Sequence, residues 1–389
     1  MRRLALVYDV AYPFVDGGGQ KRMYDVARFF VAWGWEVDWF SFKTWEGPSI
    51  QVRNGITYYG VEGYTNFYVS DGTRSLRAAL SFGRAILFAD VSFAKYDVVW
   101  CGQWPFFHIF ALTARLVPWK TQLLVDWWEV WGAHWFVYGG VSGVFGRALE
   151  WILANFITRV GHAVGISKLG IEQTLALGAR PDGLTYIPNG VDTKIFELTP
   201  AGAGATTIAS FGRIKDHKNI DHIVRAVAVA RTRGRHWVAD IIGDGPELGN
   251  IKALAHELGV DNQITFHGRV DEEKLIGLLK RAKVFVHPST KEAGGSITML
   301  EANACGLPIV CYRHPLGIDP ALIVNRVTGL LVDDIGPEGL EGGINDMLNL
   351  ATASDIRQAC INHARAFDWS VVADRYRQLV NRLLEDRGK

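Results

Sequence analysis

The stretch from residue 287 to residue 310 constrains this chain most. An apolar run at 282–286 has the length and composition of a buried strand, and Ile309 starts a second one. Between them lie a glycine pair and a segment, 297–305, whose apolar residues repeat at helical spacing. The order strand, glycine loop, helix, strand predicts one unit of a parallel α/β sheet.

The glycine loop of this unit predicts an anion site. Backbone N–H groups of Gly295, Ser296 and Ile297 at a helix start would face a phosphate. Glu292 in the loop and Glu301 in the helix add carboxylates that suit sugar hydroxyls. A plain connecting loop with two solvated glutamates fits the same residues equally well, so this stretch alone leaves both interpretations open.

Length and composition favour two folded domains. The chain has 389 residues, of which 49% are apolar and 21% charged, as in globular proteins with a sizeable core. A formal net charge of +1 gives no indication of nucleic-acid binding. The four cysteines are scattered without ligand spacing and are interpreted as reduced core thiols of an intracellular protein.

The chain shows neither a signal peptide nor an apolar run of the roughly 18 residues that cross a membrane. We therefore expect a cytoplasmic protein. Residues 73–90 predict a helix with Arg74, Arg77 and Arg84 on one face. We interpret this face as solvated, with contact to an anionic inner membrane surface as the alternative. The same pattern predicts that the leucines and isoleucine of this helix point inward: Leu76, Leu80, Ile86 and Leu87.

The first half opens with a βαβ pattern. A strand at 4–8 is followed by the glycine run 16–20, a helix at 21–33 and a strand at 35–40. The run lacks the G-x-G-x-x-G spacing of a dinucleotide site. Gly18 and Gly19 are weak candidates for ligand contact on spacing alone.

An aromatic stretch follows a predicted strand at 123–125. Twelve of the 14 tryptophans lie in the first 151 residues. Four side chains of this stretch could line a pocket, because ligands gather at the carboxyl ends of parallel strands: Asp126, Trp128, Glu129 and His134. A core of stacked aromatics, including Trp127 and Trp131, is the alternative.

The second half places polar groups after successive strands. Arg213 and Lys218 follow a strand at 207–211 and are suited to a diphosphate, although such a pair alone is more often a solvated loop. Gly243 follows the next strand, and Arg269 and Val270 follow the one after.

Several ordered motifs resemble the retaining glycosyltransferases of family 4. They are P-S-x-x-E at 288–292 with E-A-x-A-x-G-x-P at 301–308, G-R with K-N at 212–219, G-x-G-P at 243–246 and I-P-N-G-V-D at 187–192. This resemblance covers the second half closely and the first half in patches. It implies the GT-B fold, an α/β architecture of two Rossmann-like domains that face each other across a cleft.

The resemblance implies a division of labour. Residues 1–188 would bind the acceptor, residues 189–368 would bind the nucleotide sugar, and the helix at 369–387 would pack back on the first domain. Hexose transfer from a UDP- or GDP-sugar to a glycan or lipid-linked acceptor would retain the anomeric configuration and form an α-linkage. No Asp-x-Asp motif is present, so no metal or other cofactor is expected.

The resemblance also assigns roles to residues. Arg213 and Lys218 would stabilise the leaving diphosphate together with the N–H groups at Gly295 and Ser296, and Glu301 would hold the ribose. Glu292 would touch the transferred hexose. The remaining implied contacts are to the nucleotide, the sugar or the acceptor: Gly243, Arg269, Val270, Ile297, Gly18, Gly19, Asp126, Trp128, Glu129, His134 and Asn189.

Two departures from the family pattern keep alternatives open. The loop between Glu292 and Glu301 is one residue longer than usual, and Trp128 stands where relatives have a histidine. A GT-B nucleotide-sugar epimerase, which would turn over donor without acceptor, is one alternative. A catalytically silent protein that binds a sugar or a partner is the other.

Overall fold

The chain forms two compact units in a computed structural model. Unit 1 comprises Met1–Pro188 and Trp369–Lys389, and unit 2 comprises Asn189–Asp368. The structure describes residues 1–63, 75–116, 120–140, 143–292, 295–350 and 354–386. Each unit is built around its own sheet of mostly parallel strands, which confirms the predicted α/β fold class.

Unit 1 contains an eight-stranded sheet in the order β3-β4-β2-β1-β5-β6-β7-β8. Its neighbouring strands pair in parallel except β3 and β4, which form an antiparallel hairpin at one edge. The central strands are buried on both faces, which explains their continuous apolar sequences. The strands are β1 (Arg3–Val7), β2 (Glu36–Lys43), β3 (Ile50–Arg53), β4 (Ile56–Gly63), β5 (Val98–Gly102), β6 (Gln122–Trp127), β7 (His162–Gly165) and β8 (Leu184–Tyr186).

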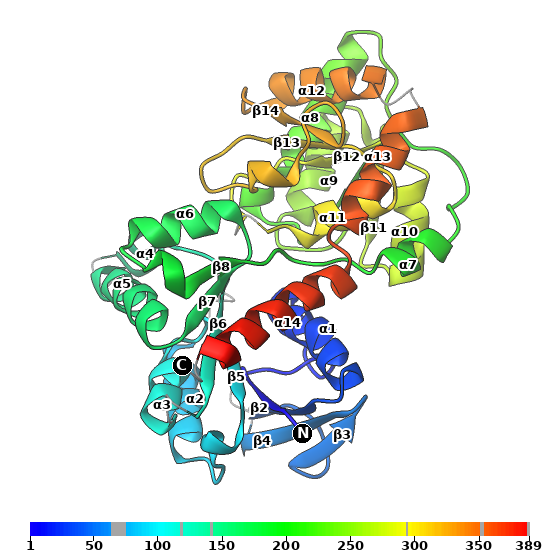
Figure 1. The fold of residues 1–389 in the computed structure, drawn as a ribbon. Coiled ribbons are helices and arrows are strands. Elements are labelled where there is room, and N and C mark those ends of the chain that lie inside the picture. Colours follow the sequence, from blue (N-terminus) through cyan, green and yellow to red (C-terminus); the bar gives the residue numbers. More distant parts are fainter. Residues whose placement is uncertain (64–74, 117–119, 141–142, 293–294, 351–353, 387–389) are drawn as a thin grey trace. The chain divides into compact units, whose positions relative to one another are not determined.

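Helices cover this sheet on both faces. The first and last helices of the chain pack against each other, while α2, α3 and α5 lie on the opposite flank of unit 1 (Figure 1). The helices are α1 (Gly18–Ala32), α2 (Leu76–Phe88), α3 (Phe107–Arg115), α4 (His134–Gly139), α5 (Gly143–Val160), α6 (Lys168–Ala176) and α14 (Trp369–Asp386).

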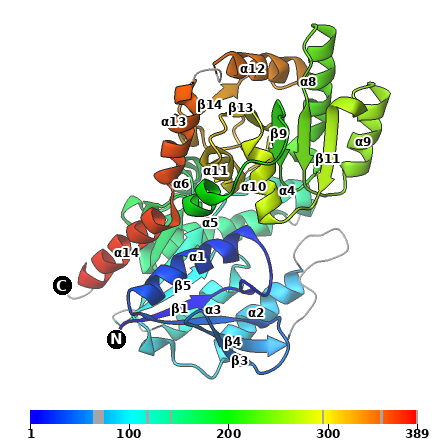
Figure 2. The same ribbon diagram turned by 90° about the vertical axis from the view of Figure 1, so that its right-hand side faces the viewer.

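Unit 2 contains a six-stranded parallel sheet in the order β11-β10-β9-β12-β13-β14. The strands are β9 (Ile208–Phe211), β10 (Ala239–Ile242), β11 (Ile264–Gly268), β12 (Val284–His287), β13 (Ile309–Tyr312) and β14 (Gly329–Val332). Helices flank the sheet, as Figure 2 shows for α8, α9 and α12. They are α7 (Thr193–Leu198), α8 (Ile220–Thr232), α9 (Leu248–Glu257), α10 (Glu272–Lys280), α11 (Ile297–Ala304), α12 (Pro337–Leu350) and α13 (Ser354–Arg365).

The unit predicted from residues 287–310 is present as β12, α11 and β13. Strand β12 pairs in parallel with β13, and Phe285 lies opposite Ile309. Helix α11 starts at Ile297 and ends before Gly306, whose φ of +77° suits a glycine after a helix. The local sequence pattern therefore predicted this βαβ unit, with the helix start correct, the first strand displaced by one to two residues and the helix end one residue too late.

Two details of unit 1 differ from the sequence-based expectation. Helix α1 begins at Gly18, so Gly18 and Gly19 form its first turn instead of a preceding loop. In α2, Ile86 is buried as predicted, but the prediction that the leucines point inward is wrong: Leu76, Leu80 and Leu87 are exposed.

The buried face of α2 is instead formed by Ala78, Phe82, Gly83 and Ile86. Small residues let α2 approach α3 closely, since a Cβ added at Gly83 would lie 2.9 Å from the Cβ of Phe107. Of the predicted arginines, Arg77 and Arg84 are exposed, whereas Arg74 lies outside the described residues.

Candidate functional site

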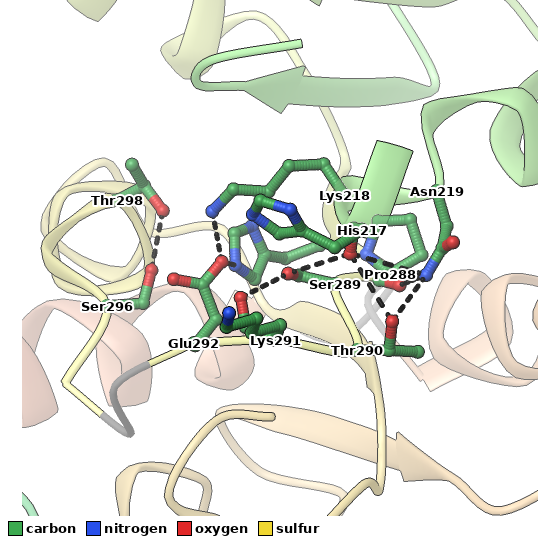
Figure 3. Close-up of polar contacts among 11 residues, drawn as sticks. His217, Lys218, Asn219, Pro288, Ser289, Thr290, Lys291, Glu292, Ser296 and Thr298 are labelled. Carbon is green, nitrogen blue, oxygen red and sulfur yellow. Dashed lines mark hydrogen bonds and ion pairs between the residues drawn. The ribbon is translucent and has the colours of Figure 1, made fainter. Parts of the chain in front are cut away.

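A charged cluster lies at the carboxyl ends of β9 and β12 in unit 2 (Figure 3). The Oε1 atom of Glu292 accepts hydrogen bonds from the Lys218 ammonium and from Nε2 of His287, the latter at 2.9 Å. All three side chains are largely buried. Two predicted residues, Lys218 and Glu292, are thus in direct contact.

Backbone interactions fix the two loops that carry this pair. The side-chain amide of Asn219 donates to the carbonyl oxygen of Pro288 at 2.9 Å. The backbone N–H of Thr290 donates to the carbonyl oxygen of His217 at 3.0 Å. The N–H of Glu292 donates to the carbonyl oxygen of Leu316 at 2.8 Å. These bonds hold the loops of residues 212–219 and 288–292 side by side.

The cluster shifts the protonation of its members. Burial by itself raises the pKa of Glu292, but His287 and Lys218 outweigh it and hold that pKa well below its usual range. Burial and the neighbouring Lys218 lower the pKa of His217. Glu292 is therefore a carboxylate at every physiological pH.

Arg213 is placed differently from Lys218. Its side chain is exposed, and the structure shows no ion pair between Arg213 and another described residue. The adjacent loops are joined by a bond of 2.9 Å from the N–H of Ile214 to the carbonyl oxygen of Asp244. Gly243 lies in this contact with φ +131°, and a Cβ there would be 1.9 Å from the carbonyl oxygen of Gly212. Gly243 is therefore required by a close approach of two loops.

The next loop carries Arg269 and Val270. The Arg269 side chain is 86% exposed and its Nε lies 3.7 Å from a carboxylate oxygen of Asp244. The N–H of Gly243 donates to the carbonyl oxygen of Gly268 at 2.8 Å. The loops after β9, β10 and β11 are thus adjacent.

Helix α11 presents its N-terminus in the same unit. The Asn189 amide donates to the carbonyl oxygen of Gly295 at 2.5 Å, and the hydroxyls of Ser296 and Thr298 are 2.8 Å apart. Ile297 is the first helical residue, and Glu301 lies half-buried one turn later. The structure thus brings together Asn189 and the predicted helix start, while residues 293–294 lie outside the described part.

In unit 1, Asp126 belongs to a buried network. Its carboxylate accepts from Nε of Arg22 at 3.0 Å and from the hydroxyl of Tyr376 at 2.5 Å. The Arg22 guanidinium also donates to the carbonyl oxygens of Ile187 and Pro188 at 2.8 and 2.5 Å. The ion pair of Asp126 and Arg22 therefore connects β6, α1, α14 and the chain at residues 187–188. The predicted action of Asp126 on a sugar stays a prediction.

Trp128 packs its indole against two glycines. A Cβ added at Gly19 or Gly102 would lie 2.5 or 2.6 Å from Cη2 of Trp128, and the ring contacts Tyr8 edge-on with 5.2 Å between centroids. The indole Nε1 lies 3.5 Å from Asp126. Trp128 thus fills the space that Gly19 leaves open.

The remaining candidates of unit 1 follow β6. Glu129 is half-buried, and its backbone N–H donates to Oε1 of Gln103 at 3.2 Å. His134 is the first residue of α4. Trp127 is a fully buried core residue, which confirms the core interpretation for that side chain. Trp131 packs in tilted geometry against Trp104 and Trp135, with 5.1 and 4.9 Å between ring centroids.

Sequence reasoning missed four side chains at these places: His287, Arg22, Tyr376 and Glu150. His287 could have been found, because it ends a strand five residues before Glu292. Glu150 is fully buried and accepts from the N–H groups of Trp131 and Gly132 at 2.7 and 2.9 Å, and burial raises its pKa. Nothing in the local sequence of Arg22, Tyr376 or Glu150 predicts such distant partners.

Within the part of the chain that the structure describes, no group of three or more His, Cys, Asp or Glu side chains is arranged to hold a metal ion. No described helix is long and apolar enough to cross a membrane.

Family comparisons agree with the fold and the motif order. Residues 192–367 match the model of the glycosyl transferases group 1, and residues 17–190 match that of the glycosyl transferase 4-like domain. The chain belongs to the family 4 type of glycosyltransferases with the GT-B fold. The predicted family is confirmed.

Related proteins support this assignment at low identity. The chain is 28% identical over 232 residues to a GDP-mannose-dependent alpha-(1-6)-phosphatidylinositol monomannoside mannosyltransferase of Mycobacterium tuberculosis. That match spans 54% of this chain and 60% of the relative's length.

Solved structures share the fold over the whole chain. Sucrose-phosphate synthase from Thermosynechococcus elongatus has a TM-score of 0.78 at 20% identity, with 99% of this chain and 100% of that one covered. HepE of Anabaena in complex with UDP has a TM-score of 0.71 at 15% identity, with 98% and 100% covered.

Proposed function

We propose that this glycosyltransferase moves a hexose from a nucleoside-diphosphate sugar to a glycan or lipid-linked acceptor, with retention and an α-glycosidic bond. The observation that carries the proposal is the contact between Lys218 and Glu292, with exposed Arg213 on the same loop. A cation at this position suits a diphosphate, and a carboxylate held ionised suits sugar hydroxyls.

Each group has a part in the proposed reaction. The bond from the anomeric carbon to the diphosphate breaks while the acceptor hydroxyl attacks from the same face and gives its proton to the leaving phosphate. Arg213, Lys218 and the N–H groups of Gly295 and Ser296 stabilise the charge that develops on the phosphate. Glu292 holds hydroxyls of the hexose, and Glu301 holds the ribose.

The donor class is a UDP- or GDP-sugar. The name of the mycobacterial relative includes GDP-mannose, and the Anabaena structure contains UDP. The same relative acts on a phosphatidylinositol mannoside by its name, which supports a lipid-linked acceptor.

A nucleotide panel tests the proposal. Thermal unfolding is followed with UDP, GDP, ADP and dTDP, for wild type, Arg213→Ala and the control Arg225→Ala, an arginine of α8 that faces Asp221. At about 100 times its dissociation constant a nucleotide adds about 2.7 kcal/mol of stability. We expect one nucleotide to stabilise wild type and the control but not Arg213→Ala. Absence of stabilisation by all four would refute the donor site.

Product analysis separates the proposal from its rivals. NMR of the product should show an α-linkage from an α-configured donor, and an inverted product contradicts retention. An epimerase would consume donor without acceptor. A silent binder would show no turnover in wild type. For such a protein the activities of wild type and Glu292→Gln would be equal, both at background level.

A further inference from the structure

Two helices of unit 1 leave large apolar side chains in solvent. On α2, Leu80 is 49% and Phe88 77% exposed. On α5, Phe145 is 78% and Trp151 55% exposed. Helices of a folded domain usually turn such residues toward the core, and contiguous exposed apolar surface marks an interaction site. Among the described residues, none covers these side chains.

The two helices belong to one continuous surface. Helix α2 packs closely on α3 because Gly83 lacks a side chain at the contact with Phe107. Helix α3 in turn contacts α5 through Phe110 and Phe156, whose ring centroids are 6.0 Å apart. The row α2, α3, α5 therefore lies on one flank of unit 1 (Figure 1).

The exposed charged side chains of α2 and α5 themselves are all positive. Arg77 of α2 and Arg147 of α5 are exposed beside the apolar residues. Helix α2 contains no acidic residue, and Glu150 of α5 is fully buried. Arg84 of α2 is also exposed, but its charge is paired, because it donates to Glu62 of β4 at 2.6 Å. Apolar and cationic side chains thus share the outer faces of both helices without an exposed carboxylate on either helix.

We propose that this face, defined by Arg77, Leu80, Phe88, Phe145, Arg147 and Trp151, docks on an anionic lipid surface. Apolar side chains enter the boundary between head groups and acyl chains, and arginines bind the lipid phosphates. A symmetric dimer through the same face would place like charges opposite each other, which is unfavourable. The helices lie on the membrane, consistent with the finding that no described helix could cross it.

Vesicle sedimentation of the intact chain tests this inference. The protein is centrifuged with vesicles of phosphatidylcholine alone or mixed equally with phosphatidylglycerol. We expect it to pellet with the mixed vesicles and to stay in solution with the neutral ones. Phe145→Ser/Trp151→Ser should lower the partition coefficient by about tenfold or more. Arg77→Gln/Arg147→Gln should lower it by about fivefold per residue and weaken its dependence on salt.

Matched controls make the result specific. Leu198→Ser/Ile335→Ser removes exposed apolar side chains of unit 2 and should bind vesicles like wild type. Thermal unfolding and nucleotide stabilisation should be unchanged in every variant, since none of the substituted residues belongs to the proposed donor site. The docking inference does not rest on the proposed reaction, so each can fail alone.

Three results would overturn the inference. The wild type could stay in solution with anionic vesicles. Both double variants could pellet as the wild type does. Sedimentation velocity could show a wild-type dimer that Phe145→Ser/Trp151→Ser converts to monomer, which would assign the face to a second copy of the chain.

Discussion

Arg22 and Asp126 form an ion pair in the interior of unit 1, with 3.0 Å between Nε and Oδ2, although 104 residues separate them. Their side chains are 1% and 0% exposed. The same guanidinium holds the carbonyl oxygen of Pro188, and the same carboxylate accepts from Tyr376. One buried charge pair thus anchors both the residues where the chain leaves unit 1 and the helix with which it returns.

This anchoring predicts strong, non-additive effects on stability. Asp126→Leu leaves the Arg22 charge buried without its partner and should cost about 3–5 kcal/mol of unfolding free energy. Arg22→Met should cost a similar amount, and the double variant should cost clearly less than the sum. Urea unfolding measures all three. Additive costs would contradict coupling of the pair. An Asp126→Asn protein that keeps its stability but loses kcat would instead support the catalytic prediction for Asp126.

The contact of His287 with Glu292 predicts a positioning role for the histidine. His287→Gln removes a partner that lowers the pKa of Glu292, so this pKa should rise. We expect kcat to fall by about 10- to 100-fold with a small change in the donor KM, as for residues that orient a functional group. The acid limb of the kcat/KM profile should move to higher pH, because Glu292 now protonates there.

The pH profile distinguishes positioning from a purely structural role. A loss of kcat with an unmoved acid limb would contradict the proposed link to Glu292. Gln263→Ala is a suitable control, because Gln263 is buried in the same unit but bonds to the Trp237 carbonyl oxygen at 2.9 Å. The Gln263→Ala variant should lose stability without moving the acid limb of the kcat/KM profile.

The packing of Trp128 on Gly19 predicts a steric coupling. Gly19→Ala would place a Cβ 2.5 Å from the indole, so we expect it to destabilise unit 1 by about 1–3 kcal/mol. In a Trp128→His background the same substitution should be nearly neutral. Gly18→Ala is the matched control, since no atom lies within 4 Å of its added Cβ. Chemical unfolding of wild type, Gly19→Ala, Trp128→His and the double variant measures the coupling. An equal loss of stability from Gly19→Ala in both backgrounds would exclude it.

Local pattern predicted much of this molecule. The strand, loop and helix around Glu292 follow from apolar spacing and glycine positions, which act over a few residues. The partners of Arg22 could not be predicted, because Asp126 and Tyr376 reach it only through tertiary packing. Lys218 and Glu292 were each predicted as site residues, but not their pairing across 74 positions.

The error in α2 has a physical cause. Its sequence offers two helical stripes, one with Leu76, Leu80 and Leu87, and one with Ala78, Phe82 and Ile86. Hydrophobicity favours the leucine stripe. Close packing on α3 favours the stripe that contains small residues, and packing decided the orientation.

Buried His162 predicts that stability falls in mild acid. The residue lies in β7 with Nε2 at 2.8 Å from Oγ1 of Thr185, and burial, followed by the charge of Arg382, lowers its pKa to about 4. The unfolded chain has a histidine pKa near 6.5, so below that pH the unfolded state binds the proton and the folded state does not. The stabilisation is complete above pH ~6.5 and is lost as the pH falls toward ~4, by up to about 3 kcal/mol.

Burial also lowers the pKa of His217 and His363, which adds losses of the same sign. The test is therefore a comparison of wild type with His162→Gln. The loss of unfolding free energy on acidification is measured for each protein from urea midpoints at pH 7.5, 6 and 5. We expect the variant to lose less stability on acidification, and parallel losses in the two proteins would rule out His162 as the source.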